Sequence, residues 1–378
     1  MKVSRILLLS IKAGSGHIRA AAAVETALRE CYPQIMVKNV EALQYTNPTF
    51  AKTFTETYNR LATELPSVWG YIYEQMERKP ANSRMKQLSA RFSRLNAPAL
   101  SRLVREYDPD VILCTHYFPA EVLAARQRRG KLRARLCLVL TDYDIHSMWI
   151  QPGVAHYFVA TDEMKYALRM HGVGENEITV TGIPVMPVFA RGIPDRVTVR
   201  QQLGLRVDSP VILVMAGGFG LAAIDQCVGT LADMVPEAQL LAVAGNNARL
   251  HATLIRTAAT RHDRIFVFPF VNNMHELMAA SDLVVTKSGG LTSSECLALG
   301  VPMIIFQPIP GQEERNATYL LENGAALRAN SPPHLIFKAR LLLNDPGRLK
   351  RMSEAAHRIA RPRAAYEIAA ALAAGASR

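Results

Sequence analysis

Short runs of apolar, often β-branched residues alternate along this chain with stretches of helical periodicity. The runs that predict buried strands are residues 6–10, 110–114, 136–140, 156–160, 211–215, 239–244, 264–267, 283–286 and 302–306. Strands that alternate with helices predict parallel sheets with helices on both faces. The pattern restarts near Val211, after a stretch that contains Pro184, Pro187 and Pro194. We therefore predict an α/β protein of two Rossmann-type, doubly wound domains facing each other across a cleft, residues 1–190 and 191–361.

A helical insert, residues 45–107, interrupts the first of these domains. Between Tyr45 and Arg105 it has ten Lys or Arg residues and four Glu residues, interleaved with Phe50, Phe54, Tyr58, Trp69, Tyr71, Tyr73 and Phe92. Rings beside cations suit a surface at the level of lipid headgroups. The alternative, rings in the core and solvated cations, is equally compatible with the pattern. A second cluster, residues 126–135, has six cations and no anion and fits either a solvated loop or an anionic surface.

Composition narrows the class of protein. A length of 378 residues agrees with two domains, and 49% hydrophobic with 20% charged residues indicates a folded chain. The net charge of +12 predicts an anionic partner, such as nucleic acid, anionic lipid or a phosphorylated substrate. The five scattered cysteines form no Cys-x-x-Cys pair, which argues for a reducing compartment and against a zinc or disulfide framework.

Two apolar stretches invite a membrane interpretation, and neither supports a spanning segment. The N-terminal run is cut by Lys12 and continues into a glycine loop, so we interpret it as a buried strand and not a signal peptide. The longest uncharged stretch, residues 209–224, is interrupted by glycines and is shorter than a membrane-spanning helix. If the protein meets a membrane, we expect peripheral binding.

The most informative motif follows the predicted strand 283–286. Gly289 and Gly290 precede a predicted helix, 291–299, whose first turn offers free backbone N–H groups to phosphate. Glu295, one turn into that helix, can accept hydrogen bonds from ribose hydroxyls. Downstream, Gln312, Glu313 and Asn316 supply the donors and acceptors that sugar hydroxyls need. These groups predict a nucleotide-sugar site.

Residues 281–324 resemble the donor half of the glycosyltransferases that include monogalactosyldiacylglycerol synthases and processive diacylglycerol glucosyltransferases. They are also similar to the peptidoglycan enzyme that adds N-acetylglucosamine to a lipid-linked intermediate. Near the N-terminus, Gly14-Ser-Gly-His17 resembles the glycine-rich loop of the diacylglycerol branch, and residues 141–149, Thr-Asp-Tyr-Asp-Ile-His-Ser-Met-Trp, resemble its mid-chain segment. The likeness spans nearly the whole chain in the same order.

The resemblance implies a GT-B-like fold in which a C-terminal helix, 362–378, packs back on the N-terminal domain. It implies an inverting transferase that moves a hexose from a UDP-hexose to a diacylglycerol-type lipid. The acceptor would bind the N-terminal domain at the cytoplasmic face of an anionic membrane. No metal or other cofactor is expected, and no nucleic-acid partner, because the charge comes without a helix-turn-helix, zinc or RNP-like signature.

Candidate residues on the acceptor side surround the first glycine loop. His17 is the favoured general base, since the start of a helix tends to keep an imidazole neutral. Its structural alternative is a hydrogen bond to the loop or to phosphate. Asp142 is the second candidate base, or the residue that orients a histidine. Gly16, His116 and His146 are expected to line the acceptor side.

Candidate residues on the donor side fall in three segments. The glycines after strand 211–215 offer N–H groups to a diphosphate, although a tight turn needs some of the same glycines. By resemblance, the segment around Phe270 and Val271 reads the uracil edge. The expected donor-binding residues are Gly217, Gly218, Phe219, Phe270, Val271, Ser288, Gly289, Gly290, Thr292, Glu295, Gln312, Glu313 and Asn316. Arg315 departs from the family pattern, which leaves the donor sugar open.

Three alternatives remain at this stage. Asp142-Tyr-Asp144 spells an acidic motif with which other glycosyltransferases hold a divalent metal, but here the donor signals lie far downstream, in the second repeat. Transfer of N-acetylglucosamine to another lipid-linked acceptor is the nearest enzymatic alternative. A non-hydrolysing UDP-sugar epimerase shares the architecture but does not explain the basic, aromatic insert.

Overall fold

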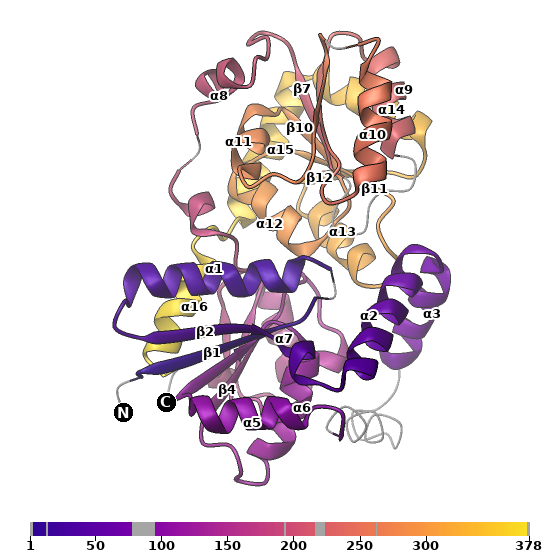
Figure 1. Ribbon diagram of the computed structural model, residues 1–378. Helices are drawn as coiled ribbons and strands as arrows, with labels where there is room; N and C mark the ends of the chain where they lie inside the picture. The colour runs from indigo at the N-terminus through magenta and orange to yellow at the C-terminus, as the bar shows by residue number, and fades with distance from the viewer. Residues whose placement is uncertain are drawn as a thin grey trace. The chain divides into compact units, whose positions relative to one another are not determined.

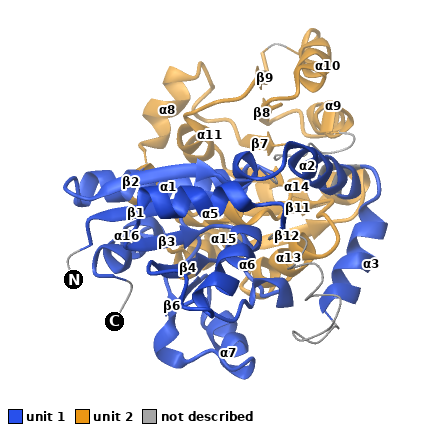
Figure 2. Ribbon diagram, turned by 60° about the horizontal axis from the view of Figure 1, so that its bottom comes forward, with its two compact units in different colours: residues 1–187, 362–378 blue, residues 188–361 orange. Residues whose placement is uncertain are grey.

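The computed structural model describes residues 3–12, 14–77, 95–192, 194–215, 224–261 and 263–375. The chain divides into two compact units, which Figure 2 shows in different colours. Unit 1 contains Met1–Pro187 and Pro362–Arg378, and unit 2 contains Val188–Arg361.

Unit 1 is built on a parallel six-stranded sheet in the order β2-β1-β3-β4-β5-β6. Its strands are β1 (Arg5–Ser10), β2 (Met36–Glu41), β3 (Val111–Cys114), β4 (Arg135–Val139), β5 (His156–Val159) and β6 (Ile178–Val180). The strand order reverses between β1 and β3. In open parallel sheets, ligands bind at the carboxyl ends of the strands beside such a reversal.

The helices of unit 1 cover its sheet and carry the insert. They are α1 (Gly16–Cys31), α2 (Pro48–Thr63), α3 (Pro66–Glu77), α5 (Pro98–Tyr107), α6 (Tyr117–Gln127), α7 (Asp162–Met170) and α16 (Ala364–Ala373). The C-terminal helix α16 lies against α1 (Figure 1). Small residues on both helices, among them Ala23, Ala27 and Ala369, let them approach closely, while Leu28 and Ile368 fill the core beside them.

Unit 2 repeats the plan with a parallel sheet in the order β12-β11-β10-β7-β8-β9. Its strands are β7 (Val211–Met215), β8 (Gln239–Val243), β9 (Ile265–Phe268), β10 (Leu283–Thr286), β11 (Met303–Phe306) and β12 (Ala326–Ala329). Its helices are α8 (Arg196–Gln202), α9 (Ile224–Met234), α10 (Ala248–Ala258), α11 (Met274–Ala280), α12 (Gly290–Ala298), α13 (Gln312–Glu322), α14 (Pro332–Leu343) and α15 (Pro346–Ile359). Here the order reverses between β7 and β10.

The predicted fold class, an α/β protein with two doubly wound sheets, is confirmed. The sequence pattern did not reveal β2, β6 and β12, which all lie at edges of the sheets. An edge strand contacts one neighbour and buries less of its surface, so it needs no continuous apolar run. In β2, every residue retains some exposure, whereas the central strands β3 and β7 are buried throughout.

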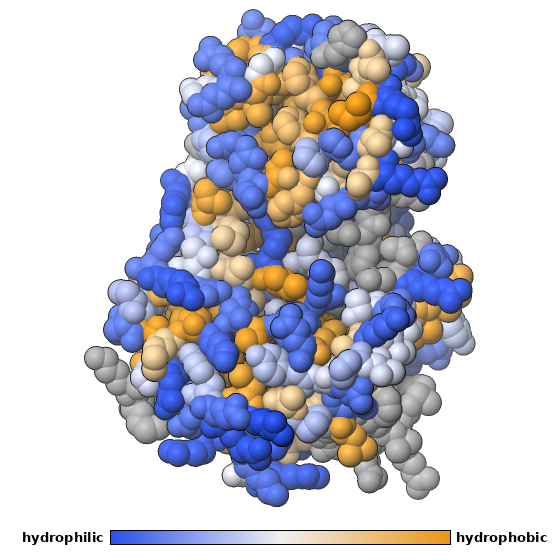
Figure 3. All heavy atoms as spheres, in the orientation of Figure 1, coloured by the Kyte–Doolittle hydropathy of each residue, from blue (hydrophilic) through white to orange (hydrophobic). Residues whose placement is uncertain are grey.

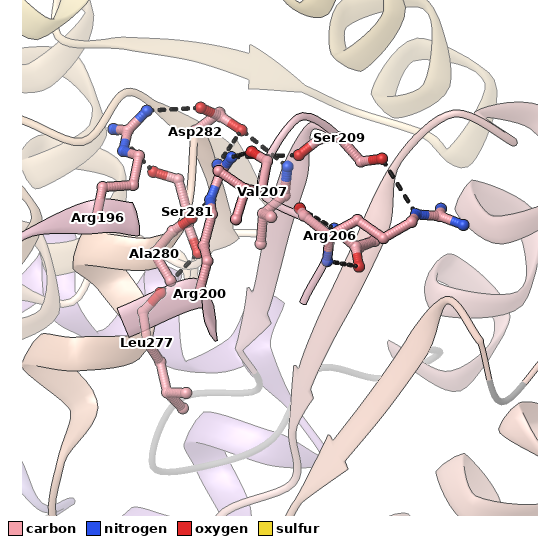
Figure 4. A network of polar contacts seen from close by, with 11 residues as sticks. Arg196, Arg200, Arg206, Val207, Ser209, Leu277, Ala280, Ser281 and Asp282 are labelled. Atoms are coloured by element: carbon pink, nitrogen blue, oxygen red, sulfur yellow. Dashed lines mark hydrogen bonds and ion pairs between the residues drawn. The ribbon is translucent and has the colours of Figure 1, made fainter. Parts of the chain in front are cut away.

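A polar network holds α8 to the amino end of the sheet in unit 2 (Figure 4). Asp282, at the start of β10, accepts hydrogen bonds from Arg196 at 2.7 Å, from Arg200 at 2.7 Å and from the backbone N–H of Val211 at 2.8 Å. The Arg200 guanidinium also donates to the backbone carbonyls of Ala280, Val207 and Ser209. Because Arg200 is buried, these partners must stabilise its positive charge in place of water.

Most described rings of the insert pack within unit 1. Phe50 and Phe54 each lie 5.6 Å from the ring of Phe118 in α6. A second chain of ring contacts runs from Tyr58 through Trp69 and Tyr73 to His146. Of these insert rings only Tyr73 is buried, while Phe50, Phe54, Tyr58 and Trp69 keep part of their surface exposed, so ring packing holds but the core interpretation holds for Tyr73 alone. Tyr71 is 65% exposed, and Phe92 lies outside the described residues.

Exposed apolar residues also occur in unit 2. Figure 3 shows hydrophobic side chains gathered on the visible face of this unit, bordered by hydrophilic ones. Separately, an apolar groove of about 750 Å³ runs between α9 and α14, where Met234, Ile336 and Phe337 line it. Among the described residues, no helix is both long and apolar enough to cross a membrane.

Candidate active site

His17 lies at the reversal of strand order in unit 1, where β1 leads through the glycine loop into α1. Its Nδ1 is 2.7 Å from the carbonyl oxygen of Thr115, the residue that follows β3. The Thr115 hydroxyl in turn donates to the carbonyl of His17 at 2.9 Å. The hydroxyl of Thr141, which follows β4, is 3.1 Å from the same Nδ1. Residues after two strands, β3 and β4, thus hold the imidazole that follows β1.

These contacts determine the tautomer of His17. A carbonyl oxygen only accepts, so Nδ1 carries the proton and the neutral ring keeps the lone pair of Nε2 as a proton acceptor. Burial lowers the pKa of His17 from 6.5 to about 4, and the hydrogen bond to Thr115 opposes this shift in part. At neutral pH the ring is uncharged, which is the form that a general base requires.

Aromatic side chains surround the His17 ring. His116 meets it edge to face with ring centroids 4.6 Å apart, and Trp149 lies 6.0 Å away. Trp149 also contacts His116 and Tyr117. His116 is buried, and its Nδ1 accepts the backbone N–H of Phe118 as the cap of α6. Burial holds the pKa of His116 well below its usual value, and so does the neighbouring His17.

The segment 141–149 carries the remaining acceptor-side candidates. Asp142 is half-buried directly after Thr141. Asp144 uses Oδ1 to accept the backbone N–H of Ile145 at 2.7 Å. His146 has no exposed surface: its Nδ1 accepts the N–H of Met148, and its Nε2 faces the carbonyl of Tyr73 at 2.9 Å. The described residues include no cluster of three metal-ligating side chains.

In unit 2, the loop 287–289 lies at the reversal of strand order, between β10 and α12. The start of α13 packs against this loop. The Ser288 hydroxyl donates to the carbonyl of Glu313 at 2.5 Å, and the amide of Asn316 donates to the carbonyl of Ser288 at 3.0 Å. Glu313 accepts the N–H of Ile309 at 2.7 Å. These contacts bring the two segments of the predicted nucleotide-sugar motif together.

Exposure separates the donor-side candidates into two groups. Ser288, Gly290, Glu295 and Asn316 are buried, whereas Gly289, Thr292, Gln312 and Glu313 keep part of their surface exposed. On the buried side of α12, the hydroxyl of Ser293 has no hydrogen-bond partner among the described residues. Lys287 is a cation at this loop; burial lowers its pKa, and Glu313 opposes that shift.

Gly217, Gly218 and Phe219 lie outside the described residues. Phe270 and Val271 follow β9, and the Phe270 ring is 50% exposed, so it does not belong to the core of unit 2.

Sequence reasoning missed several residues of these two sites. Thr115, Thr141 and Trp149 surround His17, and Lys287 lies at the donor-side loop. Thr115 and Lys287 directly follow strands beside the reversals of strand order. That position is the signal that could have identified them, once the order of strands is known.

Each of the two units resembles a known protein family. The monogalactosyldiacylglycerol synthase family matches residues 17–185, and the glycosyltransferase family 28 C-terminal domain matches residues 211–368. A processive diacylglycerol beta-glucosyltransferase of Bacillus pumilus (strain SAFR-032) is 30% identical over 357 residues, which cover 93% of this chain and 89% of that protein. The chain belongs to the diacylglycerol glycosyltransferase family. The predicted resemblance and enzyme class, a glycosyltransferase, are confirmed.

Solved structures extend the likeness at the level of the fold. MurG of Acinetobacter baumannii matches with a TM-score of 0.64 and 16% identity, over 97% of this chain and 98% of that chain. A UDP-GlcNAc 2-epimerase from Neisseria meningitidis, solved bound to UDP-GlcNAc, matches with a TM-score of 0.60 and 15% identity, over 98% of this chain and 99% of that chain. The fold is therefore of the GT-B type, which transferases and epimerases share.

Proposed function

We propose that this glycosyltransferase moves a hexose from a UDP-sugar to a diacylglycerol-type lipid, with inversion at the anomeric carbon. Family membership supports the lipid acceptor, because the relative from Bacillus pumilus is named for diacylglycerol. The bound UDP-GlcNAc of the epimerase with the same fold supports a UDP-linked donor. The observation that carries the mechanism is the geometry of His17.

In the proposed reaction, Nε2 of His17 accepts the proton of the lipid hydroxyl as its oxygen attacks the anomeric carbon. The bond from that carbon to the diphosphate oxygen breaks, and the UDP leaves with the bonding electrons. Thr115 supports the step because its carbonyl holds Nδ1–H and so keeps Nε2 unprotonated. Asp142, half-buried after β4, remains the second candidate base.

The donor side of the proposal rests on α12 and its loop. The free N–H groups at the start of α12, together with the half-buried Lys287, favour the negative diphosphate. Glu295 would accept hydrogen bonds from the ribose, and the partly exposed Gln312 and Glu313 would contact the sugar. Because these groups stabilise the negative charge of the diphosphate, we propose that no metal takes part in the reaction.

The decisive experiment compares His17→Asn with the parent enzyme in a buffer containing a chelator. Diacylglycerol and a panel of UDP-hexoses are supplied, lipid products are identified by mass spectrometry, and their anomeric configuration by NMR. We expect His17→Asn to lower kcat by about 10²- to 10⁴-fold, the usual contribution of a general base, without changing UDP affinity. His171→Asn, an exposed histidine of unit 1, serves as the matched control.

Three outcomes would contradict parts of this proposal. Full activity of a folded His17→Asn variant would transfer the role of base to Asp142. Turnover that requires added Mn²⁺ would contradict metal independence. Epimerised UDP-sugar without any glycolipid would favour the epimerase alternative, with which the chain shares its fold.

A further inference from the structure

The end of α3 is joined to the segment that follows β4 by a set of hydrogen bonds. Oε2 of Glu77, the last residue of α3, accepts the backbone N–H of Ser147 at 3.0 Å and lies 3.2 Å from Nε2 of His146. The same Nε2 is 2.9 Å from the carbonyl of Tyr73, and the Ser147 hydroxyl donates to the carbonyl of Met76 at 3.3 Å. Residues 146 and 147 thus bind the last turn of α3.

The tautomer of His146 matches this role. Its Nδ1 accepts the N–H of Met148 at 3.1 Å, as the N-cap of the short 3₁₀ helix η2 (Ser147–Trp149). The neutral ring then carries its proton on Nε2, which faces two acceptors, the Tyr73 carbonyl and the Glu77 carboxylate. One imidazole therefore caps η2 and ties it to α3.

The short helix η2 connects this contact to the acceptor-side site. Trp149, its last residue, is 6% exposed and packs against His17 and His116 with ring centroids 6.0 Å and 5.7 Å away. Thr141, on the same segment, approaches Nδ1 of His17 at 3.1 Å. A shift of residues 146–149 would therefore move the ring that packs on His17.

We propose that Glu77 and His146 form a positioning latch, in which α3 holds Trp149 against His17 and so keeps the Nε2 of His17 directed at the acceptor. The latch rests on the proposed role of His17 as base. Among the described contacts, neither residue meets the His17 ring, and both act through Trp149. The insert α2–α3 thereby contributes to catalysis by its contact with η2, independently of any contact with lipid.

Two substitutions at Glu77 separate positioning from a loss of charge. Gln retains an oxygen that can take the place of Oε2 and accept from both Ser147 and His146, whereas Ala removes the acceptor. Because a small displacement of a catalytic group can cost about 100-fold in rate, we expect Glu77→Ala to lower kcat by about 10- to 100-fold with an unchanged KM for the donor. Glu77→Gln should restore most of this loss.

A second readout does not depend on activity. The chain has two tryptophans, so in a Trp69→Phe background the emission reports on Trp149 alone. We expect Glu77→Ala to shift this emission to longer wavelength and to increase its quenching by acrylamide, while Glu77→Gln leaves both unchanged. The matched control is Glu56→Ala, which removes an exposed carboxylate of α2.

His146→Asn tests the latch if Glu77→Ala fails to fold. Asn is a good N-cap, so it can still accept the N–H of Met148, but it is too short to reach the Tyr73 carbonyl. It should reproduce the loss of kcat and the change in Trp149 emission. Unchanged emission in folded Glu77→Ala, or an equal loss of kcat in the Gln and Ala variants, would overturn the latch. An emission change in Glu77→Ala together with a fully active His17→Asn variant would show that α3 positions Trp149, but would reject His17 as base and with it the catalytic role of the latch.

Discussion

At the scale of single residues, the chemistry of His17 depends on groups that are distant in the sequence. Its proton position is set by the carbonyl of Thr115, and its charge state by burial. An imidazole in water would be partly protonated near pH 6.5. In this fold the pKa of His17 falls to about 4, so the neutral form persists well into the acidic range.

This shift predicts the pH dependence of the reaction. The base is active when neutral and becomes inactive as the pH falls through its folded-state pKa. Because that pKa is about 4 and not 6.5, kcat/KM should stay nearly constant from pH 7 down to about pH 5 and decline only below it. Circular dichroism at each pH distinguishes this decline from acid unfolding. A decline centred near pH 6.5 would mean that another group limits the reaction.

Glu295 gives a second prediction at this scale. Its carboxylate is 3% exposed on α12, one turn from the loop that we assign to the diphosphate. If it binds the ribose, Glu295→Ala should weaken UDP binding by about 1.5–3 kcal/mol, the usual contribution of a hydrogen bond to a charged group. Calorimetric titration with UDP measures this change. Unchanged affinity in a folded variant would assign Glu295 a structural role.

At the scale of elements, one carboxylate at the amino end of β10, opposite the donor-side loop, supplies the charged partner of two arginines of α8. Asp282 binds Arg196 and Arg200 of α8 and also caps the first N–H of β7 (Figure 4). The network thus joins a helix to two neighbouring strands, whose carboxyl ends flank the reversal of strand order.

Removing this carboxylate should destabilise unit 2. Asp282→Ala leaves the buried Arg200 guanidinium without its charged partner, which typically costs about 3–5 kcal/mol. Urea unfolding, fitted with a separate transition for each unit, measures the loss. Asp233→Ala removes an exposed partner of Arg261 and should cost about 1 kcal/mol or less. Equal losses in the two variants would contradict the special role of Asp282.

At the scale of the whole molecule, a net charge of +12 agrees with an anionic partner, and we propose that this partner is a membrane surface. The turn between α6 and β4 exposes Arg129, Lys131 and Arg133, while the guanidinium of Arg128 donates to the carbonyl of Pro152. On the insert, Leu65, Val68 and Tyr71 are exposed apolar residues. Cations and apolar side chains on one unit suit peripheral binding to lipid.

This proposal predicts the effect of neutralising the turn. Each cation near an anionic leaflet contributes about 1 kcal/mol, so replacing Arg129, Lys131 and Arg133 by Gln should weaken binding to anionic vesicles by about 100-fold at low salt. Vesicle flotation measures binding, and UDP affinity should not change. Replacing Arg256, Lys350 and Arg351 of unit 2, which are also exposed, is the matched control. Equal binding of both variants would show that the turn is merely solvated.

The sequence by itself determined the parts of the protein that depend on local pattern. Central strands such as β1, β7 and β10 are buried on both faces, so each needs an unbroken apolar run that can be recognised without a structure. The loop before α12 was equally recognisable, because a glycine pair between an apolar run and a helix has few other uses. The fold class followed from these patterns, whereas the enzyme family followed from the resemblance of residues 281–324 and of the N-terminal glycine loop to known glycosyltransferases.

Only the tertiary structure decided which distant residues meet. Edge strands such as β2 carry no distinctive apolar pattern. Each has a neighbouring strand on one side only, so its residues stay partly exposed and need not be apolar. Thr115 and Thr141 each precede a candidate residue, His116 and Asp142, but only the parallel strands bring both threonines to the ring of His17. His146 was expected to line the acceptor side, and the fold instead surrounds it with α3. Burial, tautomer and pKa arise from such contacts between segments, and a local pattern does not encode them.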